Sequence, residues 1–533
     1  MLFLFQLTRY ISLVSVSTPF TFVGLFEYAV LGLVSNLLFL IIPYFFLKIT
    51  IKKYAALLAV PLVISNVFYF THLFFLKTPI SLGAIAVIGE TSPQETIEFL
   101  SLVGPKIILG SIFLALLPLS VLFIKVKSSE FDGVKQKLAI LILLPLYLIV
   151  NLSINKRVSQ KTLIPFYNSF VFNDITQIRY YYKEQKKLTA QMKLRKDKKL
   201  DATFVGKKDE QNIILIIGES MSKYHVPFYG YKRNTMPQLS KIKDELFIFN
   251  NVISPATQTR ESILRMLTMA AENDENPFYE KASVIKAANE AGYETSWISN
   301  QMMLGISDTE TSVIAKDSKF TKFINSDWHT NSLDENLLPY LKDRLNKKSS
   351  KKLIVLHMLG NHFEYQYRYP KEDNYFNNLS DKFSNYLSDN HKKVINHYDN
   401  SIRYSDNFIY NVIKQVRSKN IPSVVIYLSD HGEELYDDEN LFIGHGSPDL
   451  RKEAVDIPFF MWYSKHYEKE ELPSLAVDNK YNSGDLFFTL ADVMNLSFKE
   501  LDKTKSIVSP HFVTKKRRVV NSNNVLINYT DIH

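Results

Sequence analysis

The sequence predicts two regions of different architecture: an N-terminal α-helical transmembrane bundle of about five helices, followed by an α/β domain with a central, largely parallel sheet. Three observations lead to this prediction. Charged residues are scarce in the first part of the chain, the same part contains apolar stretches of about 20 residues, and short β-branched runs alternate with helical patterns after residue 211. A length of 533 residues also favours more than one domain.

The uneven charge distribution excludes a single globular domain. Of the 63 Lys/Arg and 54 Asp/Glu in the chain, residues 1–155 contain only ten basic and six acidic ones. That region is about 10% charged, whereas soluble domains average ~25%. The 37 Phe and 30 Tyr exclude an intrinsically disordered chain.

Two further features of the composition restrict the chemistry and the partners. The absence of cysteine excludes disulfides, zinc fingers, iron–sulfur clusters and a cysteine nucleophile. The net charge of +9 is divided between the apolar region and the rest of the chain. It therefore indicates membrane topology and a solvated surface, and we expect no nucleic-acid partner.

Five apolar stretches are candidates for membrane helices and define a transmembrane domain at residues 1–155. Four of them have the required length and composition, namely residues 28–47, 54–75, 105–124 and 138–154. The fifth, residues 4–26, contains Arg9 and many Ser and Thr. We interpret it as a first membrane helix, with an N-terminal signal as the alternative.

The loop charges predict the orientation. Lysines follow the stretch at 28–47 and lie between the stretches at 105–124 and 138–154, which marks those loops as cytoplasmic (Lys48, Lys52, Lys53, Lys125, Lys127, Lys135 and Lys137). The loop at 77–104 has one Lys and three Glu and suits the outer side. The chain after residue 155 is therefore expected outside the cytoplasm.

Residues 156–210 are predicted to form a basic connector with interfacial helices. Residues 179–208 hold eleven Lys/Arg and three acidic residues, with three consecutive tyrosines at 180–182. This composition is typical of a helix that lies on anionic lipid headgroups. A solvated linker and a nucleic-acid-binding arm have the same composition, and the adjoining membrane helix favours lipid over nucleic acid.

Residues 211–533 are predicted to form the α/β domain. Short apolar runs indicate buried strands at 212–217, 295–298, 353–358, 423–428 and 459–463. Residues 280–291 have the pattern of a helix that ends at Gly292. Because strands alternate with helices, the sheet is expected to be largely parallel.

Potential metal ligands follow three of these strands. Glu219 follows the first, His362 follows the strand at 353–358, and Asp430 and His431 follow the strand at 423–428. Taken singly, such a Glu is more often a helix N-terminal charge, and such a His is more often a core or surface residue. Ligands bind beyond the carboxyl ends of parallel strands, so the coincidence predicts a metal site, most simply for zinc.

At these residues the sequence resembles the phosphoethanolamine transferases, inner-membrane enzymes of the alkaline phosphatase/sulfatase superfamily that modify lipopolysaccharide. The opening motif of that family is similar to residues 218–239, GESMSKYHVPFYGYKRNTMPQL, and a second motif to SDHGEE at 429–434 and GHG at 444–446. YDNSI at 398–402 and WISNQ at 297–301 also fit. The resemblance covers nearly the whole chain and implies an alkaline phosphatase/sulfatase-like catalytic domain.

The resemblance also implies roles for individual residues. The family places a threonine nucleophile in a stretch similar to 254–262, SPATQTRES, which implies Thr259 as the catalytic residue and Thr257 as the alternative. It implies a Zn²⁺ site, with Mn²⁺ or another divalent ion as the alternative, whose ligands are Glu219, Thr259, Asp430 and His431. It further implies that His362 and His445 bind the phosphate or a second metal.

The chain departs from the family pattern in two respects. Ala256 and Leu264 stand where members often have Gly and Pro, which affects the choice between the two threonines. Many members also carry disulfides in this domain, whereas this chain has no cysteine and must rely on packing.

The implied reaction moves phosphoethanolamine from phosphatidylethanolamine to lipopolysaccharide, on lipid A or a core sugar, through a covalent phosphothreonine. Zinc lowers the pKa of a bound hydroxyl, so it would activate the threonine for attack on phosphorus. The expected partners are the donor lipid, the lipopolysaccharide acceptor and membrane lipids, and the expected state is a monomer. The expected location is the Gram-negative inner membrane, as a multi-pass protein with a periplasmic catalytic domain.

Three alternatives remain at this point. A phosphoglycerol transferase that uses phosphatidylglycerol would share the membrane layout, threonine and zinc. A sulfatase would need a formylglycine precursor motif, and none is present near Thr259. A non-catalytic membrane scaffold would not require the complete set of metal ligands.

Overall fold

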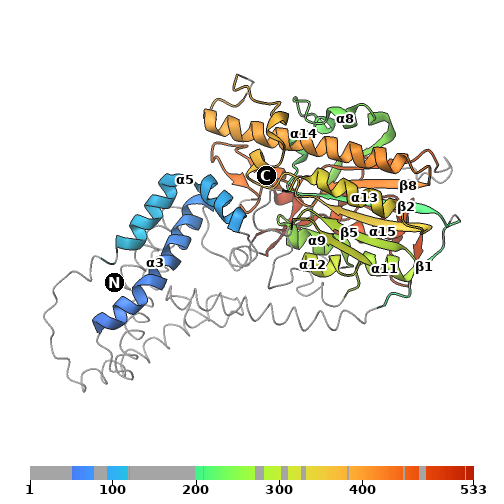
Figure 1. Ribbon diagram of the computed structural model, residues 1–533, viewed down its shortest axis with the longest axis horizontal. Helices are drawn as coiled ribbons and strands as arrows, with labels where there is room; N and C mark the ends of the chain where they lie inside the picture. The colour runs from blue at the N-terminus through green and yellow to red at the C-terminus, as the bar shows by residue number, and fades with distance from the viewer. Residues whose placement is uncertain are drawn as a thin grey trace, which may run out of the picture. The chain divides into compact units, whose positions relative to one another are not determined.

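The computed structural model describes residues 51–76, 93–117, 119, 199–207, 209–269, 281–301, 310–325, 332–380, 383–447, 450–466, 476–522 and 524–533 (Figure 1). By its contacts the chain divides into two units. One comprises Met1–Gly89 and Ile97–Lys186, and the other comprises Glu90–Thr96 and Lys187–His533.

Two helices are described in the N-terminal part, α3 (Ile51–Leu76) and α5 (Pro93–Leu116). They coincide with two of the expected apolar stretches, 54–75 and, in part, 105–124. The stretches at 4–26, 28–47 and 138–154 and most of the connector lie outside the described residues. Across the described ranges, none of the helices reaches the combination of length and sustained hydropathy that a bilayer crossing demands.

Helix α5 has a break in its middle that its sequence explains. Gly104 has a φ of 77°, and Pro105 follows it. Proline disfavours the helical conformation in the residue before it, and glycine reaches a positive φ at little cost. The predicted apolar stretch at 105–124 therefore begins at the kink in α5. A further helical segment precedes the kink and extends back to Pro93.

The second unit is built on a seven-stranded sheet, within the described residues. In the order in which they lie across the sheet, the strands are β3 (Leu246–Phe249), β11 (Phe459–Tyr463), β8 (Ser423–Ser429), β2 (Gln211–Gly218), β7 (Lys351–His357), β5 (Glu294–Ser299) and β6 (Phe320–Phe323). All five predicted strands are present, each within two residues of its expected ends.

The sheet is largely parallel, as expected, but it is mixed because the strand at 459–463 runs in the opposite direction. The five strands from β8 to β6 are parallel to one another. Strand β11 runs antiparallel to both β8 and β3. A buried apolar run has the same composition in either direction, so the sequence pattern could not reveal this reversal.

Helices cover both faces of the sheet. Figure 1 shows α8 (Pro237–Ser240) and α14 (Asp389–Arg417) on one side, where α13 (Leu338–Leu345) also contacts α14. On the other side lie α9 (Thr259–Leu267), α11 (Val284–Glu290), α12 (Glu310–Ala315) and α15 (Leu486–Val493). Side chains from both faces bury the central strand β2 completely, which explains why its sequence is an unbroken apolar run.

Local sequence signals determine where two of these helices begin and end. Ser388 caps α14 through a capping box, in which its hydroxyl accepts from the backbone N–H of His391. Ser283 caps α11 by accepting from the N–H of Lys286, and Gly292 follows the helix with a φ of 83°. The predicted stop at Gly292 is therefore confirmed, whereas the helix starts later than residue 280.

Residues before 211 already contribute to this unit. Strand β1 (Thr203–Phe204) pairs antiparallel with β13 (Leu496–Ser497). The Glu290 carboxylate accepts hydrogen bonds from the backbone N–H groups of Leu200 and Ala202. Three more two-stranded pairs are β4 (Asn251–Ile253) with β12 (Lys480–Asn482), β9 (Glu434–Leu435) with β10 (Ile443–Gly444), and β14 (Arg518–Val520) with β15 (Leu526–Asn528).

The hairpin of β14 and β15 forms hydrogen bonds with two loops that are distant from each other in sequence. Val520 donates its N–H to the carbonyl of Pro255 and accepts the N–H of Thr257. Beyond the strand, the hydroxyl of Ser522 donates to the carbonyl of Gly446. The hairpin therefore holds the loop before α9 and the loop after β10.

Candidate active site

The carboxyl ends of β2, β7 and β8 meet at one edge of the sheet, as the sequence predicts. The N–H of Asp430 donates to Gly218 at 3.0 Å, and the N–H of Met358 donates to Ile217 at 2.9 Å. Because β2 lies between β7 and β8, the residues that follow the three strands are neighbours.

Four of the predicted site residues come together at this edge. The Thr259 hydroxyl lies 3.1 and 3.2 Å from the two Glu219 carboxylate oxygens and 3.2 Å from His431 Nε2. His431 Nε2 also lies 3.2 Å from Glu219 Oε1 and 3.5 Å from Asp430 Oδ2. Glu219, Asp430 and His431 are buried and form a group that could hold a metal ion.

The spacing and bonding of these atoms fit a four-coordinate cation. Zinc–ligand bonds of ~2.0–2.1 Å in a tetrahedral site put the ligand atoms about 3.3 Å apart, close to the separations observed. Asp430 Oδ2 is buried and has no hydrogen-bond partner within the described chain, as expected of an atom that binds a cation. His431 Nδ1 donates to the Gly432 carbonyl at 2.8 Å, which directs Nε2 toward the carboxylates.

The electrostatics of these residues point the same way. Burial alone would raise the pKa of Glu219, but the hydrogen bond and charge of His431 hold it well below its usual range. Burial and the Glu219 charge raise the pKa of Asp430. Burial would lower the pKa of His431, but the charges of Asp430 and Glu219 raise it. The two carboxylates therefore stabilise a positive charge between them.

The two candidate threonines have different surroundings. Thr259 is the first residue of α9, and its hydroxyl faces the ligand group. Thr257 is fully buried, its N–H bonds to Val520, and its hydroxyl has no hydrogen-bond partner in the described part of the chain. Of the two hydroxyls, that of Thr259 therefore lies among the potential metal ligands.

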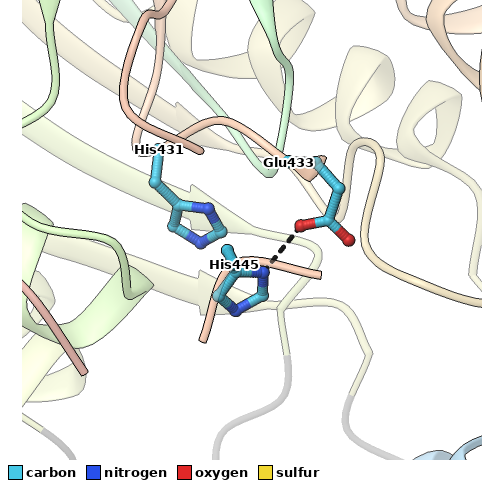
Figure 2. A group of neighbouring side chains, drawn as sticks. All are labelled: His431, Glu433 and His445. Atoms are coloured by element: carbon cyan, nitrogen blue, oxygen red, sulfur yellow. Dashed lines mark hydrogen bonds and ion pairs between the residues drawn. The ribbon is translucent and has the colours of Figure 1, made fainter. Parts of the chain in front are cut away.

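A second group of potential ligands adjoins the first and consists of His431, Glu433 and His445 (Figure 2). His445 Nδ1 donates to Glu433 at 2.7 Å, and the rings of His431 and His445 are 4.1 Å apart between centroids. The Tyr365 hydroxyl donates to the other Glu433 oxygen at 2.6 Å. A buried carboxylate therefore orients His445, and Nδ1 as donor leaves its Nε2 available.

Sequence reasoning did not single out Glu433. The available signal was its place in the same strand-end motif, two residues after His431. Its link to His445 depends on the pairing of β9 with β10, which returns the chain toward the strand end.

His362 belongs to neither group of potential ligands among the described residues, although its charge contributes to the lowered pKa of Glu219. Its turn is held by the buried Asp334 carboxylate, which accepts the N–H groups of Leu359 at 2.8 Å and Gly360 at 2.9 Å. The next N–H, of Asn361, donates to the Glu219 carbonyl at 2.9 Å. Asp334 was also missed, because its partners are the backbone N–H groups of Leu359 and Gly360 and the side-chain amide of Asn300, all distant in sequence.

Gly360 is required where this turn meets Glu219. Its φ is 52°, and a Cβ there would lie 2.8 Å from the Glu219 nitrogen. Gly360→Ala is expected to destabilise the domain by roughly 1–3 kcal/mol more than Gly292→Ala. Gly292 shares the positive φ, but a Cβ there would meet only the end of the Lys351 side chain at 4.0 Å. Thermal unfolding midpoints of the two variants test this, and equal losses would contradict a clash at Glu219.

Residues 211–496 match the model of the sulfatase family. The matched segment is more than half of the chain. Phosphoethanolamine transferase EptC from Escherichia coli (strain K12) is 30% identical over 364 residues. That match covers 66% of this chain and 63% of EptC, so the chain spans less than two thirds of the relative's length.

Two solved structures extend the comparison. The C-terminal periplasmic domain of E. coli EptC in complex with Zn is 30% identical, with a TM-score of 0.59, covering 62% of this chain and 96% of that one. The integral membrane protein lipooligosaccharide phosphoethanolamine transferase A from Neisseria meningitidis is 22% identical, with a TM-score of 0.69 over 94% of this chain and 95% of that one, and this likeness shows the fold. The chain therefore belongs to the sulfatase family, among relatives that are named phosphoethanolamine transferases.

Proposed function

We propose that this protein is a metal-dependent phosphoethanolamine transferase that moves phosphoethanolamine from phosphatidylethanolamine to lipopolysaccharide, with Thr259 as the nucleophile. The observation that carries the proposal is the position of the Thr259 hydroxyl, 3.1–3.2 Å from Glu219 and His431 at the start of a helix. The names of the relatives support the transferred group.

The ligand set proposed for zinc is Glu219, Asp430 and His431, with the Thr259 oxygen as the fourth ligand. The zinc complex of the related periplasmic domain supports this choice of metal. A bound zinc ion supplies Lewis-acid chemistry and lowers the pKa of an oxygen that it contacts. His362 and His445 are proposed to bind the phosphate or a second metal, and Glu433 joins His445 in that role.

In the proposed reaction the Thr259 hydroxyl gives its proton to Nε2 of His445, whose Nδ1 is held by Glu433, and Oγ1 attacks phosphorus while the bond from phosphorus to the glycerol oxygen of the donor breaks. His445 then passes that proton to the leaving diacylglycerol oxygen. In the second step the acceptor loses its proton to His445 and attacks the phosphothreonine, and the Thr259 oxygen takes the proton from His445 as its bond to phosphorus breaks.

We further propose the domain division and location expected from the sequence: a transmembrane domain at 1–155, a basic connector at 156–210 and a periplasmic catalytic domain at 211–533, in the Gram-negative inner membrane. The likeness in fold to an integral membrane protein over 94% of the chain supports this location. Anchoring in the membrane raises the effective concentration of two lipid substrates. The proposed state is a monomer.

The test supplies the full-length protein in vesicles with labelled phosphatidylethanolamine or labelled phosphatidylglycerol, together with lipopolysaccharide. Release of diacylglycerol and label transfer only from phosphatidylethanolamine are expected. Transfer only from phosphatidylglycerol would identify a phosphoglycerol transferase, and transfer from neither lipid would favour a non-catalytic scaffold. Mass spectrometry of the labelled lipopolysaccharide would then locate the acceptor on a lipid A phosphate or on a core sugar.

A further inference from the structure

The side chain of Gln301, which follows β5, forms a hydrogen bond with the carboxylate of Glu219, the candidate metal ligand that follows β2. Gln301 lies two residues beyond β5, within the stretch WISNQ that no step of the proposed reaction uses. Its Nε2 donates to Glu219 Oε2 at 3.0 Å and to the Met358 carbonyl, at the end of β7, also at 3.0 Å. Its own N–H donates to the Ser299 hydroxyl at 3.1 Å, which fixes its backbone.

The two partners determine which way the Gln301 amide points. A carbonyl and an ionised carboxylate can only accept, so the –NH₂ group must face them and both of its hydrogens are used. The opposite orientation would set the amide oxygen against two acceptors. Gln301 is therefore a dedicated donor to Glu219.

The Glu219 carboxylate is held at both of its oxygens. The Ser220 hydroxyl donates to Oε1 at 2.8 Å, and Gln301 donates to Oε2. Oε1 is also the oxygen that lies 3.2 Å from His431 Nε2. Without the Gln301 amide, the buried carboxylate could rotate about its terminal bond and would lose a donor that offsets its negative charge.

We propose that Gln301 is a positioning residue that acts through Glu219, by fixing the carboxylate in the orientation that binds a divalent cation. Outer hydrogen bonds of this kind contribute about 10- to 100-fold to metal affinity. This role rests on the metal site of the proposed function, but it does not depend on which lipid or acceptor is used.

The test measures zinc affinity of the metal-free, full-length protein by competition with a chromophoric chelator. Gln301→Met keeps the length of the side chain and removes both donors, and it is expected to weaken zinc binding about 10- to 100-fold. The matched control is Gln366→Met, because the Gln366 amide also donates to a carboxylate, that of Glu364 at 2.8 Å, but not to a metal-ligand candidate. The control is expected to bind zinc like the wild type.

Two additional measurements separate positioning from a loss of folding. Without metal, the wild type, Gln301→Met and Gln366→Met are expected to have the same thermal unfolding midpoint. With cobalt in place of zinc, only Gln301→Met is expected to differ from the wild type in its visible spectrum. Gln301→Glu, which replaces the donor by an acceptor of the same size, is expected to lose at least as much affinity. Wild-type zinc affinity in either Gln301 variant would overturn the role, as would absence of zinc binding by the wild type. Weakened zinc binding in a protein that transfers no phosphoethanolamine would retain this role and refute the proposed function.

Discussion

Replacing Thr259 by valine is expected to lower diacylglycerol release by on the order of 10⁴-fold or more, because valine keeps the shape of the side chain but has no oxygen to attack phosphorus. The Thr259 hydroxyl is the group that lies within 3.2 Å of both Glu219 and His431. Loss of this hydroxyl should also abolish the covalent phosphoethanolamine adduct, which intact-mass spectrometry of the wild type would detect after brief incubation with donor lipid.

Thr257→Val is the matched control for that experiment. The Thr257 hydroxyl is buried and makes no hydrogen bond within the described chain, so its replacement by a methyl group should leave transfer within a few-fold of the wild-type rate. The assignment would be reversed if Thr257→Val were inactive and Thr259→Val retained both the adduct and turnover.

Asp430→Asn is expected to weaken zinc binding by more than about 100-fold while leaving the metal-free protein at least as stable as the wild type. Asp430 Oδ1 accepts the N–H groups of Ser220 and His431, and an amide oxygen can keep both bonds. Its Oδ2, which has no hydrogen-bond partner among the described residues, becomes an amide nitrogen that cannot bind zinc. Burial and the Glu219 charge raise the pKa of Asp430, so removing its charge relieves an unfavourable interaction.

Elemental analysis and thermal unfolding, with and without a chelator, measure both parts of this prediction. The wild type should lose stability when zinc is removed, whereas Asp430→Asn should show no response to the chelator. One zinc per chain in the variant, with wild-type affinity, would show that Asp430 is not a ligand.

The central strands could be predicted because burial on both faces makes each an unbroken apolar run. The reversed direction of β11 could not be predicted, because it depends on how β11 pairs with two other strands. One of them is β8, and the other is β3, which lies more than 200 residues earlier in the sequence. Strands β3 and β6 are four residues long and partly exposed, which leaves too little pattern to recognise them.

The candidate site was predictable to the extent that its residues follow strands directly. Glu219, Asp430 and His431 do so, and they come together because parallel strands end at one edge. Asp334 could not be found in this way, because it begins a short helix at Asp334–Leu337. Gln301 does lie two residues beyond β5, but a neutral amide is not one of the usual zinc ligands, so its position alone gave no signal. Both side chains form hydrogen bonds to residues that follow other strands, Asp334 to the Leu359 N–H and Gln301 to the Glu219 carboxylate. These contacts depend on the register of the folded sheet rather than on local sequence spacing.

The hairpin at residues 518–528 has a consequence for the order in which the protein matures on the ribosome. The backbone of Val520 holds the loop that precedes Thr259, and Ser522 holds the loop that carries His445. All seven strands of the sheet emerge during synthesis before this hairpin, so a nascent chain can complete its sheet while Thr259, the proposed nucleophile, is not yet held by the hairpin. The proposed transfer activity would then arise only after the hairpin has been translated.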